Sequence, residues 1–155
     1  MEQKPNQNME PKGRTANIIS SYGCPYNCLF CATRTISGRK VAYRPADEVL
    51  DEIDYFVREK SVETIIFLDD CMLADKDIFR EIIRRQYHIE IQITTVAAWH
   101  LDREILQLMK EAGLTKFGIS IESGNERVLH KIIHKPLKLE IIPEIVSICR
   151  ELDIL

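Results

Sequence analysis

Three cysteines fall within eight consecutive residues, in the stretch YGCPYNCLFCA that spans residues 22–32. Cys24, Cys28 and Cys31 follow a C-x3-C-x2-C spacing in a chain that has five cysteines. A tight group of cysteines in a chain without a disulfide framework indicates metal or redox chemistry rather than crosslinks. Three thiolates are one fewer than the four ligands of a closed structural zinc site. We therefore expect the fourth ligand to come from another part of the chain or from a bound molecule.

Two histidines are candidates for the missing ligand, since His130 and His134 form an H-x3-H pair. The two halves of a zinc finger are separated by about 12–15 residues, whereas about a hundred residues lie between Cys31 and His130. We interpret both histidines as the solvated face of a helix, whose other face carries Val128, Leu129, Ile132 and Ile133. A structural zinc protein stays an alternative, but an iron–sulfur cluster fits the thiolates better. Its remaining iron would be bound by Cys71 or left open for a substrate or cofactor.

The rest of the chain alternates between segments typical of strands and of helices. Short apolar or alternating runs predict strands at residues 16–21, 64–68, 89–94 and 116–121. Apolar residues at helical spacing predict helices that begin at Pro45, near Asp75 and at Asp102, the last ending at Ala112 before Gly113. Two further helical stretches close the chain, with Pro136 between them. Four such units predict an α/β fold with a parallel sheet, open or partly rolled, and helices on its outer face.

Residues with chemically useful side chains come directly after these strands. The cysteines follow the first strand, Asp69 and Asp70 the second, residues 94–100 the third, and Glu122 with Gly124 the fourth. In parallel α/β folds, ligands bind at the carboxyl ends of the strands. We therefore expect one site at this edge of a single domain over residues 14–155, preceded by a disordered tail at residues 1–13.

Composition argues against two classes of partner. A net charge of −3 gives no electrostatic reason to expect nucleic acid. No apolar run is long enough to span a bilayer, and the N-terminus lacks the pattern of a signal peptide. We expect the protein in the cytoplasm, where thiols stay reduced.

The stretch CPYNCLFC, with the aromatic Phe30 just before the last cysteine, resembles the cluster motif of radical S-adenosylmethionine (SAM) enzymes. In that family three thiolates bind a 4Fe–4S cluster, and the amino and carboxylate groups of SAM chelate the fourth iron. The resemblance implies that Cys24, Cys28 and Cys31 hold the cluster, that Phe30 belongs to the cofactor site and that SAM is the missing ligand. It also implies that the sheet is part of a TIM-like barrel.

The sequence FLDDCM (67–72) resembles the F-x-D-D-x-F motif of the cobalamin-associated branch of this family, with Met72 in place of the last Phe. That resemblance implies that Asp69 and Asp70 hold the amino group of SAM. The residues alone are also compatible with a solvated turn or a helix-capping pair. Glu122 resembles a glutamate that the family uses on the ribose or methionine end of SAM, and Gly124 permits a close approach of the backbone to a ligand.

The resemblance implies an enzyme that reductively cleaves SAM to a 5′-deoxyadenosyl radical, for hydrogen abstraction or for methyl or group transfer on a small-molecule substrate. An external electron donor of the flavodoxin or ferredoxin type would supply the electron. Cobalamin would take part if an additional domain or a partner chain supplies it. The family's barrel has six strand–helix units, and the four found here end at LDIL, where a fifth strand would begin. The main alternative is a non-catalytic iron–sulfur or SAM-binding module that a partner chain completes.

Overall fold

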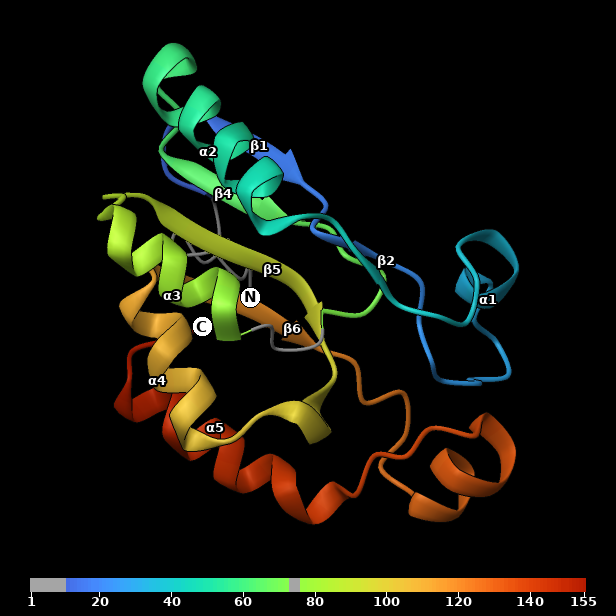
Figure 1. Cartoon of the computed structure of the whole chain (residues 1–155). Helices are drawn as coiled ribbons and strands as arrows, with labels where there is room; N and C mark the ends of the chain where they lie inside the picture. The colour runs from blue at the N-terminus through green and yellow to red at the C-terminus, as the bar shows by residue number, and fades with distance from the viewer. Residues whose placement is uncertain (1–10, 73–75) are drawn as a thin grey trace, which may run out of the picture.

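A four-stranded parallel sheet forms the centre of the protein, which confirms the predicted α/β class. The computed structural model describes residues 11–72 and 76–155. Within them the sheet has the order β1-β4-β5-β6, and each neighbouring pair of strands is parallel. Figure 1 shows these strands, which span Thr15–Ile18 (β1), Thr64–Phe67 (β4), Glu90–Val96 (β5) and Leu114–Ile119 (β6). The spatial order follows the chain order, so each strand–helix unit lies beside the preceding one.

Four helices accompany the sheet and lie on the same side of it in Figure 1. They are α2 (Ala46–Lys60), α3 (Lys76–Arg85), α4 (Arg103–Glu111) and α5 (Ile142–Glu151). Because alternate side chains of a strand point to opposite faces, Ile65 and Phe67 of β4 pack in the core under the helices. Ile66, between them, instead lines a hollow on the other face of the sheet together with Gln92 and Thr94 of β5.

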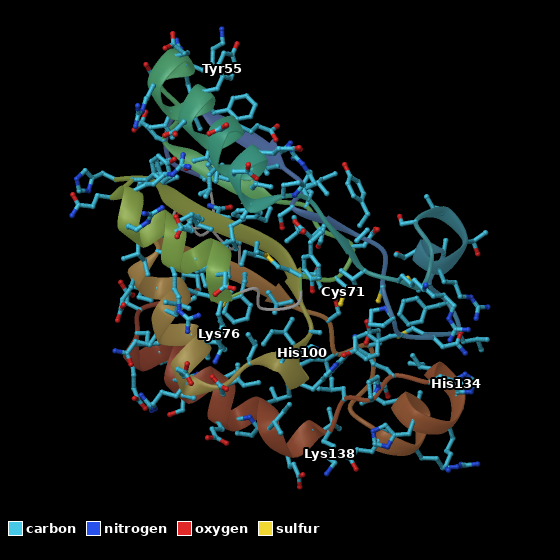
Figure 2. All side chains as sticks on the ribbon, in the orientation of Figure 1. Tyr55, Cys71, Lys76, His100, His134 and Lys138 are labelled. Carbon is cyan, nitrogen blue, oxygen red and sulfur yellow. The ribbon has the colours of Figure 1, made fainter. Side chains whose placement is uncertain are left out.

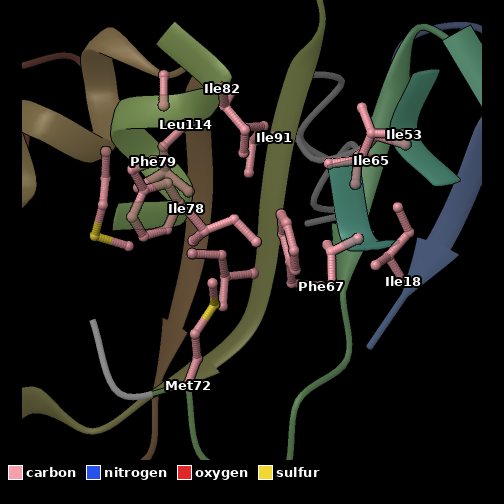
Figure 3. Packing of buried hydrophobic residues seen from close by; sticks show 14 of the residues in the cluster. Ile18, Ile53, Ile65, Phe67, Met72, Ile78, Phe79, Ile82, Ile91 and Leu114 are labelled. Carbon is pink, nitrogen blue, oxygen red and sulfur yellow. The ribbon is translucent and has the colours of Figure 1, made fainter. Parts of the chain in front are cut away.

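The core lies between the sheet and these helices, as Figure 3 shows. Ile65, Phe67, Ile53 of α2 and Phe79 of α3 each have 0% of their surface exposed. Full burial of a side chain of this size stabilises the fold by about 1.5–3 kcal/mol. This packing gives the strand ends a rigid base, and the loops of the site extend from it.

The ends of two helices follow from local chemistry. The Asp102 side chain accepts a hydrogen bond of 2.8 Å from the backbone N–H of Ile105, which confirms it as the N-cap of α4. At the other end of α4, Gly113 has a φ of +108°, and a Cβ there would lie 2.5 Å from the carbonyl oxygen of Ile89. Only glycine fits this exit from the helix. Pro45 was predicted as the first residue of α2, but it is the N-cap with a ψ of 132°, and the helix begins one residue later.

The strand predicted at residues 16–21 is two separate strands. β1 ends at Ile18, and the chain then leaves the sheet to form β2 (Ser21–Tyr22), which pairs antiparallel with β3 (Ala42–Tyr43). A short helix, α1 (Thr33–Ile36), lies in the loop between β2 and β3 and was not predicted. The break was not predicted, because Ser20 and Ser21 are compatible both with an extension of β1 and with a separate strand.

The later elements agree with the prediction in kind and differ at their ends. β5 runs two residues beyond the predicted end at Thr94, and its pairing with β6 shifts register between Ile93 and Val96. A 3-10 turn, η2 (Ala98–His100), follows β5. The two closing helical stretches are a π-helix, η3 (Val128–Ile133), and α5 preceded by the 3-10 turn η4 (Leu139–Ile141). Pro136 lies between η3 and η4, as predicted.

The end of the chain pairs with the edge of the sheet. The N–H of Leu155 donates to the carbonyl of Thr115 at 2.8 Å, and the N–H of Phe117 donates to the carbonyl of Leu155 at 3.0 Å. This is the hydrogen-bond pattern of a parallel neighbour of β6. Leu155 therefore pairs with β6 at the position where the family resemblance implies that a fifth strand begins.

Two predicted features fall partly outside the described residues. They are residues 1–10 of the predicted tail and Asp75, near which the second of the predicted helices was expected to begin. Residues 11–13 are described, and the carbonyl of Lys12 accepts a hydrogen bond of 2.8 Å from Thr64. Within the described ranges, no helix is long and apolar enough to cross a membrane.

Candidate functional site

The segments that follow the strands gather at one end of the sheet, on the right in Figure 1. The cysteine loop (residues 23–41) with α1 lies there, and the segment that contains η3 lies beside it. A backbone hydrogen bond of 2.8 Å from the N–H of Leu29 to the carbonyl of Ile133 joins the two. The carboxyl ends of parallel strands meet at the same edge, so this arrangement brings together residues that are distant in the sequence.

Three of the sulfur atoms lie around one small hollow in the cysteine loop. Cys24, Cys28 and Cys31 line it together with Tyr26, Thr33 and Arg34. The N–H of Cys31 donates to the carbonyl of Cys28 at 3.1 Å, and the N–H of Cys24 donates to the carbonyl of Gly38 at 3.2 Å. The spacing of two and three residues between the cysteines thus folds into a turn that presents all three side chains to the same space.

The donor set fits an iron–sulfur cluster. All five cysteines are free thiols, and those that line the hollow are soft ligands of the kind that hold such clusters. In residues 11–72 and 76–155, no three His, Cys, Asp or Glu side chains converge closely enough to hold a single metal ion. A 4Fe–4S cluster imposes a different requirement, since each thiolate binds its own iron.

A fourth sulfur lies next to this group, and Figure 2 labels it. Cys71 is 7% exposed, and its side chain contacts that of Cys24. Burial, with the Cys24 sulfur acting in the same direction, raises the pKa of Cys71 to about 12. Burial also raises the pKa of Cys28, and the positive charge of Lys135 opposes this effect. Cys71 is therefore a neutral thiol at neutral pH.

The two aspartates after β4 bind the chain that leads to the cysteines. Asp69 is 6% exposed, and its carboxylate accepts hydrogen bonds from the N–H and hydroxyl of Ser20 and from the hydroxyl of Ser21, at 3.3, 2.7 and 2.5 Å. Asp70 is exposed, and its Oδ2 accepts a hydrogen bond of 2.9 Å from the N–H of Gly23. The family resemblance implied that both carboxylates bind the amino group of SAM, and these contacts within the chain were not predicted.

Glu122 lies beside a buried lysine that sequence reasoning missed. The Lys135 ammonium is 2.6 Å from Oε2 of Glu122 and donates to the carbonyl of Ser120, also at 2.6 Å. It lies 5.8 Å from the centre of the Trp99 ring. The Lys135 side chain is 8% exposed and that of Glu122 24%. Nothing in the sequence distinguishes Lys135 from the neighbouring lysines at positions 131 and 138, because its burial depends on the fold.

The remaining predicted site residues lie at the margin of the site. Phe30 is 62% exposed, so its ring is available to a bound molecule. A Cβ at Gly124 would meet no atom within 4 Å, so the backbone there borders open space. Met72 is 2% exposed and pairs with Val96 of β5, which makes it part of the core rather than of the site surface.

An aromatic group joins the cysteine loop to η2. The Trp99 Nε1–H donates to the hydroxyl of Tyr26 at 2.6 Å, and the two rings meet edge to face with centres 4.8 Å apart. The Tyr26 hydroxyl also hydrogen-bonds Nε2 of His100. Burial lowers the pKa of His100, so this residue is neutral at neutral pH. Trp99 thus contacts the loop between Cys24 and Cys28 through Tyr26.

Comparison with known proteins agrees with this geometry. The family model described as Radical SAM superfamily matches residues 18–155. Cytidylyl-2-hydroxyethylphosphonate methyltransferase from Streptomyces wedmorensis is 33% identical over 142 residues, which cover 90% of this chain and 27% of that protein. Hopanoid C-2 methylase from Rhodopseudomonas palustris (strain TIE-1) is 26% identical over 127 residues, which cover 77% of this chain and 24% of that protein.

A solved structure shares the fold. The radical SAM methyltransferase TsrM from Kitasatospora setae, solved with cobalamin and a 4Fe–4S cluster bound, superposes with a TM-score of 0.82. The identity is 20%, and the match covers 91% of this chain and 28% of that one. The chain thus spans about a quarter of the length of the proteins it resembles, with shares of 27%, 24% and 28%. The family match over most of its length shows that the chain belongs to the radical SAM superfamily.

Proposed function

We propose that this chain binds a 4Fe–4S cluster through Cys24, Cys28 and Cys31 and uses it together with SAM. The observation that carries the proposal is that these three free thiols line one hollow at the carboxyl end of the sheet. Held by these three thiolates and reduced by an external donor, the cluster would supply an electron for the cleavage of a carbon–sulfur bond of SAM. The protein residues bind and orient the cofactors and keep water away from them.

The groups that we propose to face SAM carry both signs of charge. The exposed Asp70 carboxylate suits an ammonium group, and the Glu122 carboxylate suits hydroxyls or an ammonium. Lys135 beside Glu122 offers the positive charge that a carboxylate of the ligand requires. The open space at Gly124 admits a ligand against the backbone, and the exposed ring of Phe30 is available to contact a bound cofactor. Asp69 contributes to the site indirectly, because it binds the chain that leads into the cysteine loop.

For the full protein we propose methyl transfer to a small-molecule substrate. Two of the relatives are a methyltransferase and a methylase, which supports this class of reaction. Cobalamin would be supplied by another part of the protein or by a partner chain, and the electron by a flavodoxin- or ferredoxin-like donor. We place the protein in the cytoplasm, because free thiols persist in a reducing compartment.

Anaerobic reconstitution with iron and sulfide tests this proposal. We expect wild type to acquire visible iron–sulfur absorbance with about four irons per chain, and Cys28→Ala to lose it. Cys149→Ala, which changes a thiol of α5 outside the cysteine loop, is the matched control and should load as wild type does. Normal cluster loading in Cys28→Ala would refute the assignment.

The reconstituted wild-type protein also distinguishes catalysis from the binding of SAM alone. SAM is added while the electron paramagnetic resonance spectrum of the reduced cluster is recorded, and 5′-deoxyadenosine is measured afterwards. A spectrum that changes with SAM and the appearance of the nucleoside support the proposed enzyme. A changed spectrum without the nucleoside identifies a non-catalytic SAM-binding module. Zinc in anaerobically purified protein, in place of iron, identifies a structural zinc protein.

A further inference from the structure

We propose that Asp69 and Asp70 act as a clasp that positions Cys24, by binding the lead segment (residues 20–23) between β1 and the cysteine loop. In this proposal the hydrogen bonds of Asp69, and the hydrogen bond of Asp70 to Gly23, form whether or not SAM is bound. The role of Cys24 as a cluster ligand rests on the proposed function, whereas the clasp contacts are present in the chain alone.

The clasp begins where the backbone pairing of β1 with β4 stops. The last backbone hydrogen bond between the two chain segments runs from the N–H of Leu68 to the carbonyl of Ile18, at 2.9 Å. Beyond it the β1 chain turns away, and the side chain of Asp69 takes over the pairing with Ser20 and Ser21. One carboxylate thus replaces the backbone ladder for two residues.

The geometry at Asp69 is that of a completed binding site. Its Oδ1 accepts both serine hydroxyls, at 2.7 and 2.5 Å, and its Oδ2 accepts the N–H of Ser20 at 3.3 Å. The exposed fraction is 6% for Asp69, 8% for Ser20 and 2% for Ser21. A buried carboxylate is costly unless hydrogen bonds surround it, and these three donors meet that need without a ligand.

Asp70 extends the same contact to the residue before Cys24. Its Oδ2 accepts the N–H of Gly23, whose φ is +89°. A Cβ at Gly23 would lie 2.3 Å from the carbonyl oxygen of Lys40, so the return chain confines the lead segment from its other side. On that side the N–H of Arg44 also donates to the carbonyl of Ser20, at 2.9 Å.

These contacts place Cys24 relative to β4. Cys24 follows Gly23 directly, and Cys71, which follows Asp70, contacts Cys24 through its side chain. The first cysteine of the motif is therefore held to the end of a buried strand, whereas Cys28 and Cys31 lie further out along the loop. Loss of the clasp should let the Cys24 sulfur move relative to the other two.

Three variants separate the clasp from direct binding of SAM. Asp69→Ala removes all three hydrogen bonds. Ser20→Ala combined with Ser21→Ala removes two of them and leaves the carboxylate in place. Asp69→Asn keeps an acceptor for the Ser20 N–H, and its NH2 group can donate to the serine hydroxyls, which accept as well as donate. Ile82→Val is the control for a general loss of stability, because it is a small change on the buried face of α3, outside the lead segment.

The first measurement uses the chain without iron and follows amide hydrogen exchange. For Asp69→Ala we expect the Ser20 amide to exchange about tenfold faster or more, because it loses a charged acceptor. Asp70→Ala should do the same to the Gly23 amide, and Asp69→Asn should stay within about threefold of wild type. Unchanged exchange at Ser20 in Asp69→Ala would overturn the clasp.

The second measurement uses reconstituted protein and follows the loss of iron–sulfur absorbance to a chelator. The double serine variant and Asp69→Ala should lose the cluster about tenfold faster than wild type, with an altered electron paramagnetic resonance spectrum, and Asp69→Asn should restore both. Ile82→Val should leave the spectrum unchanged. If the double serine variant retains the cluster as wild type does while Asp69→Asn and Asp69→Ala equally weaken the response to SAM, Asp69 binds SAM and the clasp is wrong. If wild type acquires no cluster, the proposed function fails, and the exchange measurement still decides on the clasp.

Discussion

Replacing Lys135 with methionine removes a buried ammonium and leaves its two acceptors without their donor. Methionine has nearly the length of the lysine stem, so the apolar contacts of the side chain are retained. The change is therefore a test of the charge and its hydrogen bonds, not of packing. It also tests the link between the Glu122 segment and the cysteine loop, because η3 lies between Glu122 and Lys135 and contacts Leu29.

The expected loss of stability follows from three quantities. Each hydrogen bond to a charged group contributes about 1.5–3 kcal/mol, and Lys135 makes two at 2.6 Å, to Ser120 and Glu122. Burial of the ammonium costs part of that sum. Glu122 keeps 24% of its side chain exposed, so water replaces part of the lost bond. We expect a net decrease of about 2 kcal/mol in the free energy of unfolding, or a fall of about 4–8 °C in Tm.

Urea unfolding of the iron-free chain, followed by circular dichroism, measures this loss. Lys138→Met is the matched control, because Lys138 is three residues away and its side chain is 69% exposed, 3.8 Å from Glu140. A surface pair of this kind contributes little, so the control should stay within about 0.5 kcal/mol of wild type. A double-mutant cycle with Glu122→Gln should give a coupling energy of at least about 1 kcal/mol. Equal stabilities of the Lys135→Met and Lys138→Met variants would refute the buried ion pair and the reasoning based on it.

Two further predictions concern local contacts away from the cysteines. Asp102→Ala should lower the free energy of unfolding by about 1 kcal/mol, because it removes the cap of α4. Asp102→Asn should retain most of the stability that the cap contributes, since asparagine also caps helices well. Equal losses for the two variants in urea unfolding would count against the cap. Burial, and next the hydrogen bond of 2.7 Å to Asp54, raise the pKa of Tyr87. The free energy that the neutral Tyr87 phenol contributes to folding is therefore fully present below about pH 10, and it is lost as the pH rises through the raised pKa. The free energy of unfolding of Tyr87→Phe should for this reason fall less steeply than that of wild type from about pH 10 upward. Parallel pH profiles of the two proteins would contradict this.

Much of the fold could be predicted from the sequence because it depends on neighbours along the chain. The spacing of Val49, Leu50 and Ile53 determines which face of α2 is buried, and all three are at most 2% exposed. Asp102 caps α4 through a contact with a residue three positions away. The cysteine spacing is likewise local, and it was sufficient to indicate the cluster motif.

Strand ends could be predicted less well, because they depend on the neighbouring strand. Gly118 in β6 is an example, since a Cβ there would lie 2.4 Å from the carbonyl oxygen of Thr94 in β5. The close approach occurs where the pairing of β5 with β6 shifts register. Nothing near Gly118 in the sequence shows which residue of another strand lies opposite.

The partners of the site residues were determined only by the tertiary structure. Asp69 is 49 residues from Ser20 along the chain, and Trp99 is 73 residues from Tyr26. Their types and positions after strands could be read from the sequence, and these predicted a site at the carboxyl edge of the sheet. Which donor meets which acceptor depends on the order of the strands and the paths of the loops, and many weak contacts across the whole fold determine both. That is why the sequence could predict the aspartates as site residues, while only the folded chain showed that they accept hydrogen bonds from Ser20, Ser21 and Gly23.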